Sequence, residues 1–484
     1  LYCGFKRNLK KEVKVAQFSG YVSEHSAYHH GEVSLQMAIV GMAQDFVGSN
    51  NINLFLPNGQ FGTRLMGGKD SASSRYICTA LAPVTNDIYK TEDFPLMEFL
   101  DDDGYKIEPR FYLPIIPMAL INGAQGIGTG YSTSIPNHNP KDIIKMIYKK
   151  LDGEDISDYE IKPWFRDFKG TVIKSSKGSG YITKGKYRIL NITTLEITEL
   201  PIGVWTEDYK EFLDSILIDT RRSKLKGLKT GKVTLASKQF LKSYQNHSTE
   251  SSVRFVLKFS PTVLNNLKNK KTKDADVNFL EKKLKLTNTK ATNYTNMHLY
   301  NGKDSIQKYN SVHEIVDEFF DLRLNLYQKR KEYIERNLEL EANILEAKVR
   351  FIQDFIDNKI EIRNVKQKDL HKQFSELKYP KFDLSHVKGD VMYKPSYDYL
   401  NMRIWALTKE KVDELTELSK QKQMELALMK GKTKQDIWRE DLKSLEKSYK
   451  KYYLKPKVVM VSDKKVTKTK KVKKTKKSIK IKTL

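Results

Sequence analysis

The segment from Gln60 to Leu81 reads QFGTRLMGGKDSASSRYICTAL. It places Tyr76 directly after Arg75, at the end of a polar stretch that contains Gly67 and Gly68. A tyrosine oxygen is a potential nucleophile, and a neighbouring guanidinium can bind an anion through two hydrogen bonds. The chain has 26 tyrosines, and a tyrosine beside an arginine is usually structural. The sequence around the pair therefore has to decide between a structural and a chemical role.

The charge of the chain indicates a polyanionic partner. Its 484 residues include 86 Lys and Arg against 59 Asp and Glu, a formal net charge of +27. Because Lys and Arg bind phosphates by releasing condensed counterions, nucleic acid is the first partner to consider. The stretch from Lys455 to Leu484 holds 13 Lys and one Asp, and the rest of the chain is basic too. This stretch has no aromatic residue, so we predict that residues 456–484 form a disordered tail.

Composition excludes several classes of protein. With 39% hydrophobic residues, the chain can bury more than one core, and we expect about two to four domains. Cys3 and Cys78 are the only cysteines, too few for a disulfide framework or a four-cysteine zinc site. No run of about 18 apolar residues occurs, so no membrane partner is expected. Because the chain begins at Leu1 instead of Met, we expect it to be a piece of a longer protein.

The pattern of apolar residues predicts a mixed α/β (α+β), multidomain fold. Residues 1–90 mix short helical patterns with Gly-rich turns, and Glu32 to Phe46 has helical spacing. A small helical DNA-reading unit fits this region. The middle of the chain contains an apolar, β-rich run with two prolines, two segments of short strands and a Lys-rich segment expected to be a long exposed loop: Phe111–Ile121, Gly170–Pro201, Val253–Phe259 and Asn265–Lys285.

Two long helices are predicted in the C-terminal third. A helix that begins near Val312 carries apolar residues at steps of four and three, a heptad seam formed by Leu338, Ala342, Leu345, Val349, Ile352 and Ile356. A second helical stretch, at about 408–453, has compatible apolar positions but is interrupted at Ser419 and Lys422. The two helices and the segment between them predict an antiparallel coiled coil with a small globular tip.

The segment Gln60–Leu81 resembles the sequence around the nucleophilic tyrosine of eukaryotic and large-DNA-virus type IIA DNA topoisomerases. The resemblance extends to six other segments in the same order, up to about residue 453. These are FKRNLKKEVKVAQFSGYVSEHSAYHHGEVSL (5–35), VGSNNINLFLPNGQFG (47–62), PIIPMALINGAQGIGTGYSTSIPN (114–137), LEITELPIGVW (195–205), FFDLRLNLYQKRKEY (319–333) and WALTKEKVDEL (405–415).

The resemblance implies a chemical role for the tyrosine–arginine pair. Tyr76 is then the nucleophile that displaces a DNA 3′-oxygen and stores the bond energy in a phosphotyrosine. Arg75 is the group that stabilises the negative charge on the phosphate. The resemblance also implies DNA contacts for Tyr28 and Ser34, and it places His30 beside the cleaved strand, where it could assist charge or proton movement.

The segment NGAQGIGTG is rich in glycine but has neither the dinucleotide-binding nor the P-loop spacing. The resemblance implies that it is a hairpin that inserts Ile127 between base pairs and bends the duplex. An isoleucine between glycines would otherwise be a buried turn residue. Trp205 would likewise be a core aromatic, but the resemblance places it at the DNA-facing rim of a domain called the tower.

The sequence predicts no metal site in this chain. Asp101, Asp102 and Asp103 have a spacing that could hold magnesium, but DDDGY is typical of a solvated turn. The resemblance implies that the whole enzyme uses Mg²⁺ and ATP. Both are bound by regions that this sequence lacks, an EGDS-containing metal-binding domain and an ATPase domain, which lie upstream or on another chain. The fragment alone is therefore expected to be inactive.

The resulting hypothesis divides the chain into four regions. They are a partial winged helix with Tyr76, an α+β tower with the Gly-rich hairpin, a coiled coil that ends in a small helical dimer gate, and the tail: 1–92, 93–311, 312–455 and 456–484. The implied function is ATP-dependent breakage, strand passage and religation of double-stranded DNA by a homodimer, in the nucleus or, for a viral protein, in the host cell or virion.

Two alternatives compete with this hypothesis. A non-catalytic, dimerising DNA-bending protein would also use a basic body, a wedge and a coiled coil, but the Arg75–Tyr76 pair within GGKDSASSRY argues against it. A tyrosine recombinase would need dispersed catalytic Arg and His residues around a C-terminal Tyr, whereas Tyr76 lies near the start of the chain.

Overall fold

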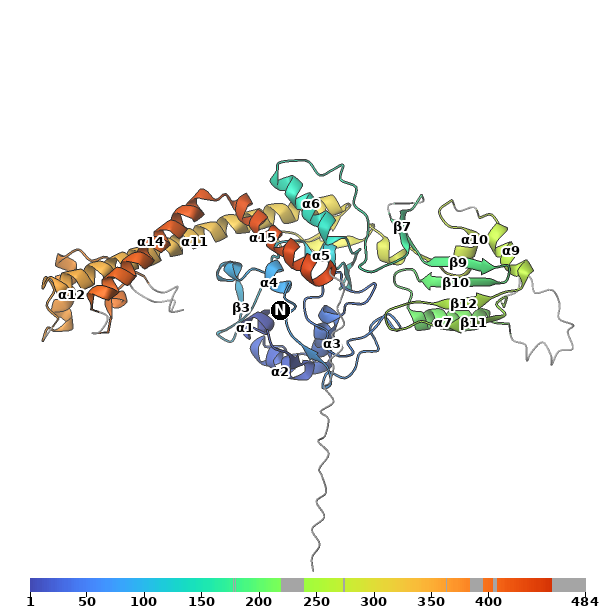
Figure 1. Ribbon diagram of the computed structural model, residues 1–484, viewed down its shortest axis with the longest axis horizontal. Helices are drawn as coiled ribbons and strands as arrows, with labels where there is room; N and C mark the ends of the chain where they lie inside the picture. The colour runs from blue at the N-terminus through green and yellow to red at the C-terminus, as the bar shows by residue number, and fades with distance from the viewer. Residues whose placement is uncertain are drawn as a thin grey trace, which may run out of the picture.

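The computed structural model describes residues 1–176, 178, 180–218, 239–272, 275–362, 364–383, 395–403 and 407–454. These residues form a central body, a sheet-rich lobe on one side and a long helical arm on the other (Figure 1). Helices and strands both contribute, as the predicted mixed α/β class requires. The predicted disordered tail, 456–484, lies outside the described residues.

The first part of the body contains two helices and a small sheet. Strand β1 (Val13–Lys14) leads directly into α2 (Val15–His25) and pairs with β2 (Cys78–Thr79), so that the end of the tyrosine segment lies against the start of this helix. Helix α3 covers Glu32–Ala43, which confirms the helical spacing read from the sequence. The other elements of this part are α1 (Tyr2–Lys6), α4 (Thr85–Ile88), η1 (Thr91–Leu96), β3 (Phe99–Asp102) and β4 (Tyr105–Pro109).

The second part of the body carries a β-hairpin on a helical base. Strands β5 (Ala124–Ile127) and β6 (Ser132–Ile135) pair antiparallel between α5 (Met118–Ile121) and α6 (Pro140–Leu151). A further hairpin, β14 (Met297–Tyr300) with β15 (Ile306–Tyr309), lies beside β6 and precedes the arm.

The lobe is built on antiparallel sheets with helices packed on them. Its larger sheet has the strand order β11-β12-β10-β9, with β9 (Lys186–Asn191), β10 (Thr194–Glu199), β11 (Ser243–Asn246) and β12 (Phe255–Lys258). A smaller sheet has the order β13-β8-β7, with β7 (Thr171–Lys174), β8 (Tyr181–Lys184) and β13 (Thr287–Asn288). The buried faces pack on α7 (Thr206–Ile216), α9 (Pro261–Asn269) and α10 (Phe279–Lys283), and η2 (Lys290–Thr292) follows.

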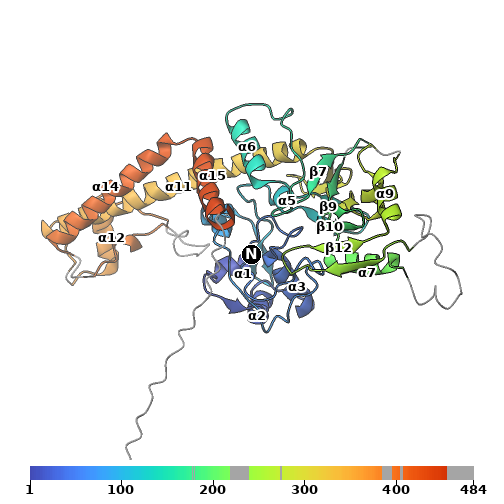
Figure 2. The same ribbon diagram turned by 45° about the vertical axis from the view of Figure 1, so that its right-hand side comes forward.

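The arm consists of α11 (Val312–Ile356), which leads outward, and α14 (Lys409–Gly431), which returns alongside it. Figures 1 and 2 show α14 continuing into α15 (Lys434–Tyr449), which lies on the body near α6. The far end of the arm has a small core of its own, with α12 (Gln367–Glu376) and η3 (Asp398–Leu400). A turn of π-helix, η5 (Lys450–Leu454), ends the described chain.

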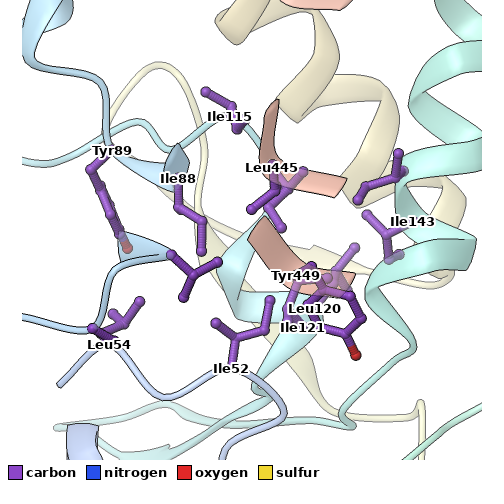
Figure 3. Close-up of a cluster of buried hydrophobic side chains, with 14 of the residues drawn as sticks. Ile52, Leu54, Ile88, Tyr89, Ile115, Leu120, Ile121, Ile143, Leu445 and Tyr449 are labelled. Atoms are coloured by element: carbon purple, nitrogen blue, oxygen red, sulfur yellow. The ribbon is translucent and has the colours of Figure 1, made fainter. Parts of the chain in front are cut away.

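The core of the body joins distant parts of the sequence. Figure 3 shows Ile52, Leu120 and Ile121 beside Leu445 and Tyr449 of α15. Trp438 of α15 is fully buried, and its indole N–H donates to the Ile115 carbonyl at 3.1 Å. Burial of this apolar surface fixes the base of the arm to the body.

A buried ion cluster also holds the arm at its base. Arg323 of α11 lies 2.8 Å from Asp93, and both side chains are almost fully inaccessible to solvent. Arg330, further along the same helix, lies 2.9 Å from Asp441 of α15, which also accepts a hydrogen bond from the Tyr327 hydroxyl. A buried charge is costly unless it is paired, so this cluster tightly constrains how α11 and α15 meet the body.

Three sequence-based expectations about secondary structure were wrong. Phe111–Ile121 forms no strand, because two prolines interrupt it and it packs as irregular chain before α5. Asn265–Lys285 is not one long loop: it contains α10 and the end of α9, whose Leu267 and Leu280 are buried in the lobe. The stretch 408–453 is divided into α14 and α15, because Thr433 begins a new helix through a capping box with Asp436.

Candidate active site

Tyr76 stands on a loop whose flanking backbone is held on both sides. The Val15 and Ala16 N–H groups, at the start of α2, donate to the carbonyls of Ile77 and Ser74 at 3.0 and 3.2 Å. The Ile77 side chain is buried, whereas that of Tyr76 is 71% exposed. The result is a phenol that projects into solvent from a fixed backbone.

Two cations accompany the phenol. The Arg75 guanidinium carbon lies 5.9 Å from the centre of the Tyr76 ring, and its side chain is exposed. The Lys14 ammonium donates to the Tyr76 carbonyl at 3.4 Å. An anion that approached the phenol oxygen would therefore meet positive charge.

The glycines that precede Tyr76 make a compact turn. The Gly68 N–H donates to the Thr63 carbonyl at 2.8 Å, and the Gln44 side-chain amide donates to the Gly68 carbonyl at 3.2 Å. Gly67 and Gly68 have φ values of +63° and +85°, which residues with a Cβ rarely adopt. Asp70 closes the turn by accepting from the Thr63 N–H at 2.8 Å.

The lobe packs against this same turn. Arg64 and Glu199 of β10 form a buried ion pair, with 2.5 Å between the guanidinium and carboxylate. Trp205, at the start of α7, lies over Gly67 and meets the Phe46 ring edge-on at 5.8 Å. Its indole is half-buried, so the described geometry gives it a packing role, and its predicted DNA contact stays a prediction.

The residues predicted to contact DNA in the SAYHH loop lie just before α3. Tyr28 is half-buried and meets His30 edge-on at 5.4 Å, whereas His30 and Ser34 are exposed. His29 lies 3.8 Å from Asp102 in the β3–β4 turn. That turn is a hairpin end in which the Asp101 carboxylate accepts from the Gly104 N–H, as expected for a solvated turn.

Ile127 lies at the end of the hairpin formed by β5 and β6, which we call the wedge hairpin (124–135). Its side chain is 94% exposed, an unusual environment for an isoleucine. Gly128 donates to the Tyr131 carbonyl at 2.8 Å and closes the turn. The buried turn residue, the alternative considered from the sequence, is therefore excluded.

The described residues offer neither a metal centre nor a membrane span. Among them, no group of three or more His, Cys, Asp and Glu side chains could hold a metal ion. No helix in the described part of the chain is long and apolar enough to cross a membrane.

Comparison with known proteins adds a family to this geometry. Residues 1–443 match the family described as DNA gyrase/topoisomerase IV. The chain belongs to this topoisomerase family. DNA topoisomerase 2 from Arabidopsis thaliana is 41% identical over 94% of the chain, and that from Acanthamoeba polyphaga mimivirus is 38% identical over 93%. The chain spans 31% and 38% of these two relatives, respectively.

A solved structure of a topoisomerase domain has the same fold. It is the Plasmodium falciparum topoisomerase II DNA-binding, cleavage and re-ligation domain, with a TM-score of 0.79 and 38% identity. The match covers 93% of this chain and 59% of the other. The resemblance read from the sequence is thus confirmed, and this member of the topoisomerase family corresponds to the cleavage core.

Sequence reasoning missed the parts that hold the tyrosine in place. Neither the Arg64–Glu199 pair nor the contact of Trp205 with Gly67 was expected. The only available signal was the pair of glycines, since adjacent glycines often mark a close approach of another group to the backbone.

Proposed function

We propose that this chain is the DNA-cleaving and gate-forming part of a type II DNA topoisomerase. The whole enzyme would break both strands of a duplex, pass a second duplex through and rejoin the ends, with ATP timing the gates. The observation that carries the proposal is the exposed Tyr76 phenol beside Arg75, on a loop fixed by α2 and by the lobe, in a member of this family. Such a phenol is accessible to a phosphate in a substrate as large as duplex DNA.

In the proposed reaction, the Tyr76 oxygen attacks the phosphorus in line with the 3′-oxygen. The new oxygen–phosphorus bond forms as the bond to the 3′-oxygen breaks, and the phenol proton leaves as the 3′-oxygen gains one. Arg75 stabilises the charge that spreads over the phosphate oxygens, and the exposed His30 is the candidate to assist the proton. The phosphotyrosine keeps the bond energy, so the reverse step rejoins the strand without outside energy.

We assign the domains as the sequence analysis divided them. The elements α2, α3, β1 and β2 support a partial winged helix at 1–92, and the lobe with the wedge hairpin supports a tower at 93–311. The paired helices and separate terminal core support a coiled coil and dimer gate at 312–455. A homodimer that persists in sedimentation after removal of the arm's tip, residues 358–405, would contradict the gate assignment.

Type II topoisomerases use Mg²⁺ and ATP, and we propose that regions outside this chain bind both. The described residues do not fit a metal: Asp101 is occupied within its turn, and no ligand cluster is present among them. We therefore derive no step through a metal from this chain. The proposed partners are double-stranded DNA, a second copy of the chain, and the metal-binding and ATPase regions. A nucleus, or the host cell or virion of a virus, is the proposed location.

Covalent trapping of DNA tests the assignment. With the metal-binding region supplied, the unmodified chain should form a tyrosine-linked DNA adduct, and Tyr76→Phe should bind DNA but form none. Arg75→Ala should cleave about a hundredfold or more slowly, the scale for one lost donor to a transition state. Tyr105→Phe, at another exposed tyrosine, is the matched control and should cleave normally.

Two outcomes would contradict the proposal. An adduct formed by Tyr76→Phe would show that another residue is the nucleophile. DNA bending without any adduct from the unmodified chain would favour the alternative, a non-catalytic bending protein.

We also propose that Ile127 is the residue that bends DNA. An exposed apolar side chain at a hairpin tip can insert at a base step, and the bent duplex then touches more protein. Ile127→Ala should reduce the bend steeply and the affinity only modestly, because the basic residues supply the long-range attraction. Ile192→Ala, which removes another exposed isoleucine from the lobe, is the matched control and should leave the bend unchanged.

A further inference from the structure

The wedge hairpin is fastened along one edge to strand β14. The Ser134 N–H donates to the Asn296 carbonyl at 2.7 Å, and the Asn296 side-chain amide donates to the Ser132 hydroxyl at 2.9 Å. The His298 N–H donates to the Thr133 hydroxyl at 3.2 Å. Three consecutive residues of β6 thus bond to the start of the β14–β15 hairpin.

The other end of the β14–β15 hairpin is fastened to α11. Glu318 accepts from the Tyr309 hydroxyl at 2.6 Å and from the Gly302 N–H at 2.8 Å, so its carboxylate holds both the turn and the last residue of β15. A Cβ at Gly302 would lie 2.7 Å from Leu322 of α11, which shows how closely the turn approaches the helix. Antiparallel pairing from Met297–Tyr309 to Tyr300–Ile306 connects these two ends.

A wedge needs support of this kind. A two-stranded hairpin is marginally stable by itself in water, and Ile127 is too exposed to anchor its own turn. Unstacking a base step costs a few kcal/mol, so the DNA pushes back on the hairpin with a comparable free energy. Without backing, the hairpin would tilt instead of opening the step.

We propose that the β14–β15 hairpin is a strut that fixes the wedge hairpin to α11, with Asn296 and Glu318 as positioning residues. This inference rests on the proposed bending role of Ile127. Because α11 continues into the arm, the strut couples the angle of the arm at its base to the bend in the DNA. Neither residue needs to touch DNA to change that bend.

Energy transfer across a short duplex labelled at both ends tests the strut in the full 484-residue chain. Asn296→Ala removes the bond to Ser132, and Glu318→Ala removes both bonds to the β14–β15 hairpin. Each variant should shift the equilibrium from bent to unbent complex by roughly 2- to 10-fold, the effect of losing about one hydrogen bond. Affinity for the duplex should change less than the bend.

Asn301→Ala is the matched control. Asn301 lies in the turn of the same β14–β15 hairpin, where its side chain accepts from the Lys303 and Ser305 N–H groups and donates to Gln307. This variant should leave the bend unchanged. Tyr309→Phe, which removes one bond to Glu318 without changing shape, replaces Glu318→Ala should that variant fail to fold.

The outcomes separate the strut from the wedge. If Ile127→Ala bends DNA as sharply as the unmodified chain, the wedge assignment fails. If Ile127→Ala loses the bend while Asn296→Ala and Glu318→Ala keep it, the wedge stands and the strut is refuted. An equal loss in Asn301→Ala would refute the positioning roles, since general hairpin stability would then explain the effect. In a double-mutant cycle, Ser132→Ala should add little to Asn296→Ala.

Discussion

Replacing Gly67 with alanine should displace the loop that carries Tyr76. A Cβ at Gly67 would lie 2.9 Å from Cδ1 of the Trp205 indole and closer still to Cε2 and Nε1, far inside van der Waals contact. The backbone is also unsuitable, because φ is +63° at this position. The indole has little room to retreat, since Phe46 meets it edge-on and Gly48 approaches it from another side.

The expected cost follows from these two effects. A left-handed conformation costs alanine about 1–2 kcal/mol, and overpacking a filled site costs about 1–3 kcal/mol. The lower entropy of the unfolded alanine chain offsets about 0.4–1 kcal/mol. We therefore expect Gly67→Ala to destabilise the loop by about 2–4 kcal/mol, and a shift of about 1 Å at Tyr76 to slow cleavage by about a hundredfold.

Single-turnover cleavage, with the metal-binding region supplied, measures the effect. Trp205→Ala in the Gly67→Ala background removes the overlap and should restore part of the cleavage rate, leaving only the backbone cost. Gly20→Ala is the control, since α2 has open space there and a helical alanine should not destabilise. Normal cleavage by Gly67→Ala would show that the contact with Trp205 does not position the nucleophile.

Other predictions concern stability, pH and salt. Asp93→Ala should destabilise the chain by about 3–5 kcal/mol in denaturant titrations because it leaves Arg323 buried without its partner, whereas Asp304→Ala, from an exposed pair with Arg110, should cost at most about 1 kcal/mol. Burial lowers the pKa of His138 to about 4 from 6.5, so its contribution is complete above pH 6.5 and is lost as the pH falls toward 4, about 3 kcal/mol in all; His138→Gln should flatten stability in this pH range. Deleting residues 456–484 should reduce the slope of log affinity against log salt by about 0.9 for each lost phosphate contact, and an unchanged slope would mean that the tail does not bind DNA.

The long, regular parts of the fold could be predicted from local sequence. Helix α11 begins at Val312 as predicted, because its apolar repeat persists for many turns and Ser311 caps its first turn. The short helices α9 and α10 were missed, because Leu267 and Leu280 lie among lysines and asparagines in a segment that reads as exposed loop. Their apolar sides are evident only against the lobe's sheet. The break between α14 and α15 was missed because the surrounding residues favour helix on both sides.

The sequence by itself determined the family and the chemical candidates, because the order of residues around Tyr76 and Arg75 is a local property that needs no folded partner to be recognised. The roles of these residues, and of Ile127, remain predictions that the experiments above would test. Only the tertiary structure decided what supports them. Glu199 is 135 residues from Arg64, and Asn296 is 164 residues from Ser132. Contacts at such separations depend on how whole elements pack, and no local pattern encodes which side chains will then lie within hydrogen-bonding distance.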